Sequence, residues 1–158
     1  MERSLTKLCI FYFVLLSCSP EKSLPIPDAG FAALIVNDID VSVNWYSEVF
    51  SLTVLNKVNL EDRGIKQVNL KGENMHIELI ELTSAVSQNE ILKDYPIKTK
   101  IEGIFKVGYY VSKFDEWVDS LIELDVNFNG DVVKDNLSGK RMLVVFDPDG
   151  NRIQFFEK

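Results

Sequence analysis

The fold is decided by the stretch VNDIDVSVNW, residues 36–45, because its pattern returns in VSKFDEWVDS at residues 111–120. In each copy an apolar run leads into polar residues that favour a helix start, and an amphipathic helix pattern follows. Four pairs of positions match in kind: Val36 and Val111, Ile39 and Phe114, Asp40 and Asp115, and Val43 and Val118. The chain is therefore expected to contain two related modules.

Each copy opens a module in which three strand-like segments follow the helix. Apolar residues with the helical period, Trp45 and Trp117 among them, predict helices at about 40–51 and 114–125. Both tryptophans are expected to pack between helix and sheet. Alternating patterns predict strands at about 53–60, 65–71 and 74–82, and at about 127–134, 140–147 and 151–157.

Neither module can bury both faces of its sheet alone, so the two are expected to pair their sheets around a central cavity. The predicted fold class is α+β, with β-α-β-β-β modules at about 29–82 and 103–158 of one domain that spans 29–158. The linker, 83–102, is polar, and a short helical turn is predicted in it near Glu90.

The start of the chain has the layout of an export signal. Arg3 and Lys7 precede an apolar run, residues 8–16, that is too short to span a bilayer, which needs about 20 residues. An ordinary signal peptide or an uncleaved anchor is one interpretation. A lipoprotein is the one we favour, because the residues after the run have the composition of a tether.

The run ends in LLSC, which resembles the lipobox of bacterial lipoproteins. The resemblance implies that residues 1–17 are a signal peptide and that the thiol of Cys18 carries a lipid, with a tether over 18–28. Ser19 is not the aspartate that is often linked to inner-membrane retention. We therefore expect a lipid anchor in the bacterial outer membrane, with the domain facing the periplasm.

Composition restricts the partners and the means of stabilisation. The formal net charge of −7 disfavours nucleic acid as a partner. The only two cysteines, Cys9 and Cys18, lie in the leader, so an apolar core must hold the exported domain without disulfides.

The duplicated pattern resembles the vicinal oxygen chelate superfamily, which includes glyoxalase I, bleomycin-resistance proteins, extradiol dioxygenases and methylmalonyl-CoA epimerase. The resemblance is carried by ALIVNDIDVSVNWYSEVFSLTV at residues 33–54 and by DPDGNRIQFFE at residues 147–157. It implies a divalent metal held by four side chains, one from the first and one from the last strand of each module. These ligands are typically His, Gln or Glu.

The four ligand positions implied by the resemblance fall on Phe31, Glu78, Lys106 and Gln154. Only Glu78 offers a strong ligand, because a phenyl ring cannot coordinate a metal and an ammonium repels a divalent cation. Gln154 is a weak neutral ligand and cannot act as a general base. We therefore expect no metal cofactor, and we do not expect the enzyme activity of the family.

An alternative keeps a divalent metal ion. His76, the only histidine, lies two residues before Glu78, so both side chains point to the same face of a strand. His76, Glu78 and Gln154 would then be the ligands, and the protein would be a metal-dependent lyase, isomerase or dioxygenase.

Our hypothesis is that the ammonium of Lys106 takes the place of the metal, pairs with Glu78 and donates to the carbonyl of Gln154. Aromatic side chains would surround this polar base, as suits a small planar or anionic ligand. The predicted ligand-binding residues are Phe31, His76, Glu78, Lys106, Tyr110, Gln154 and Phe156.

The predicted function is that of a membrane-anchored glyoxalase-like domain that has lost the metal site and binds a small molecule, in the manner of bleomycin-resistance proteins. A protein-interaction module of the cell envelope, with a plugged cavity, is the other alternative. The expected partners are a small-molecule ligand, the bilayer through acylated Cys18, and, in some arrangements of the superfamily, a second copy in a homodimer.

Overall fold

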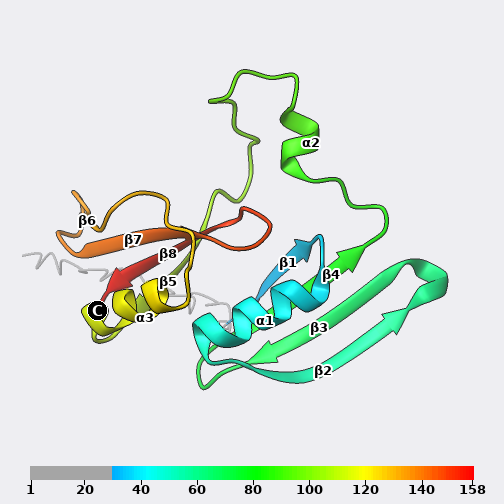
Figure 1. Ribbon diagram of the computed structural model, residues 1–158, viewed down its shortest axis with the longest axis horizontal. Coiled ribbons are helices and arrows are strands. Elements are labelled where there is room, and N and C mark those ends of the chain that lie inside the picture. Colours follow the sequence, from blue (N-terminus) through cyan, green and yellow to red (C-terminus); the bar gives the residue numbers. More distant parts are fainter. Residues whose placement is uncertain (1–29) are drawn as a thin grey trace, which may run out of the picture.

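A computed structural model describes residues 30–158, which form two modules of one helix and four strands each (Figure 1). The first contains β1 (Ala32–Val36), α1 (Ile39–Phe50), β2 (Thr53–Leu60), the short 3-10 helix η1 (Glu61–Arg63), β3 (Ile65–Lys71) and β4 (His76–Leu82). The second contains β5 (Val107–Val111), α3 (Phe114–Glu123), β6 (Val133–Lys134), β7 (Arg141–Phe146) and β8 (Arg152–Glu157). The predicted signal peptide, Cys18 and the tether lie outside the described residues.

The two modules have the same topology. The sheet of the first module, sheet A, has the strand order β1-β4-β3-β2, and that of the second, sheet B, has the order β5-β8-β7-β6. The first and last strands of each module pair in parallel, and the other pairs are antiparallel. The predicted α+β fold with a repeated β-α-β-β-β pattern is confirmed, and α2 (Gln88–Leu92) provides the helical turn in the linker.

One predicted strand is interrupted. Instead of a strand over 127–134, the structure has only β6 and an isolated bridge between Phe128 and Val145. Gly130, with φ of +92°, lies between the two and takes a left-handed conformation that breaks the ladder. The alternation of apolar residues in this segment gave no sign of the break.

The first helix starts at Ile39, one residue before the predicted position. Asp38 is the N-cap of α1, and its carboxylate accepts from the N–H groups of Asp40 and Val41. Helix α3 starts at Phe114, and its N-cap residue, Lys113, has a left-handed backbone with φ of 54° and makes no side-chain capping bond.

Helix α1 packs against both sheets. Its residues Ile39 and Tyr46 belong to the core over sheet A, whereas Val49 belongs to the core over sheet B. The ring of Phe50 lies 5.1 Å from that of Tyr109 and 5.6 Å from that of Phe155, measured between centroids. The two modules therefore meet through α1, and the prediction that Trp45 and Trp117 are packing residues is confirmed.

Each sheet has one face on this core and one face turned away from it, which we call the open face. In β8, Ile153 and Phe155 are buried in the core, so the alternating residues between and beside them belong to the open face. In β4, Ile77 and Leu79 are buried in the same way. The family's ligand positions in both strands consequently lie on the open faces.

The turn before β8 is fixed to α1 by buried carboxylates. Asp147 is only 5% exposed, and it accepts from the Tyr46 hydroxyl at 2.8 Å and from the Asn151 N–H at 2.7 Å. Asp149 accepts from the hydroxyl of Ser42 at 3.2 Å. These bonds join the end of the second module to the first turns of α1.

Burial determines the titration of this pair. It raises the pKa of the Asp147 carboxyl, although bonds from Asn151 and Tyr46 act in the opposite direction. Burial also raises the pKa of the Tyr46 hydroxyl, and the neighbouring Asp147 raises it further. Tyr46 therefore remains protonated and donates. Because the folded-state pKa of Asp147 is raised, this group on its own lowers stability as pH rises through its titration range.

Replacing Tyr46 by phenylalanine tests this connection between the modules. Tyr46→Phe keeps the ring but removes the donor to Asp147, and we expect the free energy of unfolding to fall by about 2 kcal/mol at neutral pH. The loss should shrink as pH is lowered, because the hydroxyl stabilises the ionised carboxylate more than the protonated one. Urea unfolding at a series of pH values measures both effects.

The matched control is Tyr95→Phe, since Tyr95 is an exposed tyrosine of the linker. Its unfolding free energy should stay within about 0.5 kcal/mol of the parent value. Equal losses in the two variants, or a Tyr46→Phe loss that does not vary with pH, would contradict the assignment.

Candidate functional site: two open sheet faces

Three of the predicted site residues meet on the open face of sheet A. Phe31, His76 and Glu78 line one hollow of about 220 Å³. Glu78 lies opposite Asn69 in the register of β3 and β4, and Asn69 donates to the side chain of Asn56 at 2.8 Å. Phe31 is 68% exposed, so its ring offers an apolar surface beside a carboxylate, an imidazole and an amide.

Three others lie on the open face of sheet B. The rings of Tyr110 and Phe156 stack with centroids 5.6 Å apart, and Tyr110 is 63% exposed. Gln154 lies beside them but is only 2% exposed, and its amide nitrogen donates to the sulfur of Met142 at 2.7 Å. The donor group of Gln154 is therefore used within the sheet.

The predicted ion pair between Lys106 and Glu78 is wrong. Neither residue takes part in an ion pair among residues 30–158. The reason is the packing of α1 against both sheets, which leaves Glu78 and Lys106 on different open faces. The pKa of Asp135 is lowered, chiefly by bonds from Ser138 and to a smaller extent by the charge of Lys106, so Lys106 lies toward the β6–β7 turn.

The residues at the family's ligand positions do not fit a divalent metal. Phe31 and Lys106 offer no ligand atom for a cation, and the two remaining positions, Glu78 and Gln154, lie on different open faces. In the part of the chain that the structure describes, no group of three or more His, Cys, Asp or Glu side chains could hold a metal ion. Glu78 and His76 are the two potential ligands that share a hollow.

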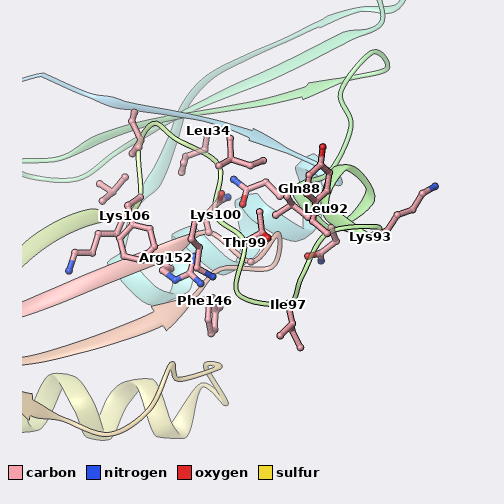
Figure 2. Close-up of a pocket in the computed structure, with 18 of the residues that line it drawn as sticks. Leu34, Gln88, Leu92, Lys93, Ile97, Thr99, Lys100, Lys106, Phe146 and Arg152 are labelled. Atoms are coloured by element: carbon pink, nitrogen blue, oxygen red, sulfur yellow. The ribbon is translucent and has the colours of Figure 1, made fainter.

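A larger hollow was missed by the sequence reasoning. It has a volume of about 560 Å³ and lies between the linker and the β8 end of sheet B, with Arg152, Lys100 and Lys106 among its lining residues (Figure 2). In the structure the linker between β4 and β5 runs from residue 83 to residue 106, beyond its predicted end. It was predicted to be polar, but it carries several exposed apolar side chains, among them Tyr95, Ile97, Ile101, Ile104 and Phe105.

The described residues contain no helix that combines the length and the apolar character needed to cross a bilayer.

Comparison with known proteins identifies the family. The model of the Glyoxalase/Bleomycin resistance protein/Dioxygenase superfamily matches residues 29–155, so the chain belongs to this superfamily. The match covers both modules and the linker between them. No curated protein matches the sequence.

Solved structures of the same fold are similar over most of the chain. The glyoxalase family protein from Enterococcus faecalis has a TM-score of 0.71 at 19% identity, covering 82% of this chain and 97% of its own. The trypanothione-dependent glyoxalase I of Leishmania major has a TM-score of 0.60 at 22% identity, covering 83% and 87%. The fosfomycin resistance protein FosX from Listeria monocytogenes has a TM-score of 0.63 at 12% identity, covering 84% and 94%. At these identities the likeness concerns the fold.

Restoring the family's carboxylate at position 154 tests how well this position suits a charge. In Gln154→Glu the new carboxylate is buried without a suitable donor, and we expect the free energy of unfolding to fall by about 2–3 kcal/mol at neutral pH. Burial raises the pKa of such a group, so the loss should disappear at acid pH, where glutamic acid is neutral and close in shape to glutamine.

The control is Gln67→Glu, which makes the same change at a half-buried position of β3. Denaturant unfolding should show a change of less than about 1 kcal/mol there. A Gln154→Glu protein that is as stable as the parent at neutral pH would show that position 154 can accept a charged ligand.

Proposed function

We propose that this domain binds a small molecule on the open faces of its sheets without the divalent metal that its superfamily usually uses. The observation that carries the proposal is the position of Lys106. It stands where the family has a metal ligand, and it lines the same hollow as a second cation, Arg152. Two positive charges at this end of sheet B disfavour a metal cation and favour ligands with negative or electron-rich groups.

The two open faces offer complementary surfaces for such a ligand. The exposed ring of Tyr110, stacked on Phe156, suits a planar group, because aromatic rings stack at such distances. Phe31, His76 and Glu78 on sheet A offer an apolar surface with polar groups at its edge.

A second copy of the chain would enclose the ligand. The two groups of residues lie on separate open faces, and domains of this superfamily commonly bind small molecules and form dimers. A dimer that places sheet A of one protomer over sheet B of its partner would bring both groups around one ligand.

A metal-dependent lyase, isomerase or dioxygenase is the second candidate, favoured by the shared hollow of His76 and Glu78. Both can ligate a metal, and in this candidate a ligand on the opposite face, such as Gln154, completes the set. An envelope protein-interaction module is favoured only by the exposed apolar side chains of the open faces, such as Ile35 and Tyr110.

Metal content separates the first two candidates. We expect the purified protein to contain no stoichiometric divalent metal, because one carboxylate and one imidazole are too few ligands. Elemental analysis measures this, and the unfolding temperature should not rise on addition of zinc, nickel, manganese or iron(II). Stoichiometric metal that is lost in Glu78→Ala, while Glu73→Ala retains it, would favour the enzyme. Glu73 is an exposed glutamate of the same module and serves as the control.

We also propose that the domain is anchored to the bacterial cell envelope through a lipid in the outer membrane and faces the periplasm. The support is the sequence LLSC before the tether, with Cys18 as the lipid acceptor. Residues 1–29 lie outside the described part of the chain, and nothing in the fold bears on this proposal.

The two cysteines provide a matched test of the anchor. When cells that express the chain are fed a labelled fatty acid, the protein should take up label and sediment with membranes. Cys18→Ala should remove both properties, because no thiol remains at the lipidation position. Cys9→Ala should remove neither, since Cys9 lies within the signal. Label that persists in Cys18→Ala would show that the anchor is not at this residue.

A further inference from the structure

The hollow between the linker and sheet B is positively charged in an acidic protein. The chain has a formal net charge of −7, yet no Asp or Glu among residues 30–158 lines this hollow. Its charged lining residues are Lys93, Lys100, Lys106 and Arg152. A concave site of one charge sign concentrates ligands of the opposite sign.

Two of these cations point away from the middle of the hollow. Lys93 pairs with Glu90 at 2.8 Å. Figure 2 shows the side chains of Lys93 and Lys106 extending outward on opposite sides of the other lining residues. Lys100 and Arg152 form no ion pair within the described residues.

Arg152 is held in place by aromatic rings. Its guanidinium lies 4.9 Å from the centroid of Phe105 in the linker and 5.5 Å from that of Phe146 in β7. Such contacts restrict the side chain of an arginine but leave its N–H groups available for a planar oxyanion. Because Phe146 lies opposite Arg152 in the sheet register, the position of the guanidinium is set by the sheet itself.

The rest of the hollow is lined by both polar and apolar side chains. Leu34, Ile101, Ile104 and Val107 supply apolar surface, and Ile104 is 89% exposed to solvent. Exposed apolar side chains around a fixed cation suit a ligand that has both an anionic end and a hydrocarbon or aromatic body. The volume of about 560 Å³ lies within the range of small-molecule sites, roughly 300–1,000 Å³.

We propose that this hollow binds a small organic anion, with Arg152 and Lys100 on its carboxylate or phosphate group and the linker residues on its apolar body. Arginine binds both kinds of oxyanion in a bidentate manner, so the two sources share one chemistry. The inference rests on the proposed function, which already uses the cations Lys106 and Arg152 of this hollow, and goes beyond it by naming the class of ligand and the residues that bind it.

Four benzene derivatives test the proposal with the purified full chain. Benzoate and phenyl phosphate carry the anion, benzyl alcohol is neutral, and benzylamine is cationic. Ligand-observed NMR titration should show binding of one or both anions at least about tenfold tighter than of the alcohol, and none of the amine. The ratio between benzoate and phenyl phosphate then identifies the preferred oxyanion. Equal binding of benzoate and benzyl alcohol would overturn the proposal.

Variants locate the binding. Arg152→Gln should weaken the preferred anion about tenfold, which corresponds to the loss of one charge-assisted contact. The control Arg63→Gln changes an exposed arginine outside the hollow and should have no effect. Lys100→Gln alters an exposed linker position that does not support the fold, and it should weaken binding about threefold or more even if Arg152→Gln proves unstable.

The outcomes also separate this inference from the open-face proposal. Anion binding that is unchanged in both Arg152→Gln and Lys100→Gln would overturn the assignment to this hollow and leave the open-face site as the place of binding. Loss of anion binding in both variants, with Arg63→Gln unaffected, would support it whatever the open faces bind.

Discussion

The packing of the two modules depends on one helix, α1, which contacts the cores of both sheets. Helix α1 contributes Ile39 and Tyr46 to one core and Val49 to the other, while Phe50 lies against the aromatic rings of both modules. Removing such an aromatic side chain from a core costs about 3–5 kcal/mol. The buried bond between Tyr46 and Asp147 adds a directional restraint, because a buried carboxylate tolerates few alternative partners.

This constraint decides what the site can be. Since α1 covers the inner face of sheet A, and α3 with the end of α1 covers that of sheet B, the ligand positions of the family lie on two open faces. Within one chain Glu78 therefore cannot compensate the charge of Lys106, and an ammonium at the edge of sheet B remains available. A lysine at that place is costly only if it is dehydrated and unpaired, and Lys106 avoids this cost by being exposed.

Much of the fold could be predicted from the sequence because it depends on local patterns. The apolar period of α1 and the alternation in β8 each indicate which side of the element is buried. Because the pattern is repeated, the same argument holds for the second module. The interruption at Gly130 and the capping by Asp38 depend on single backbone angles, which such patterns do not contain. The partners of Lys106 could not be predicted, because they depend on how two modules dock rather than on either one.

The contacts of the linker could not be predicted from the sequence either. Its apolar residues have no period, so nothing in the sequence assigns them a partner, and only the fold places Phe105 on the guanidinium of Arg152. That contact joins the linker to sheet B and leaves the charge of Arg152 without a carboxylate among the described residues. The protein has an excess of acidic residues, yet none of those described pairs with this arginine. The positive charge of Arg152 is therefore available to a ligand. A binding site for anions is the simplest physical reason for such an arrangement.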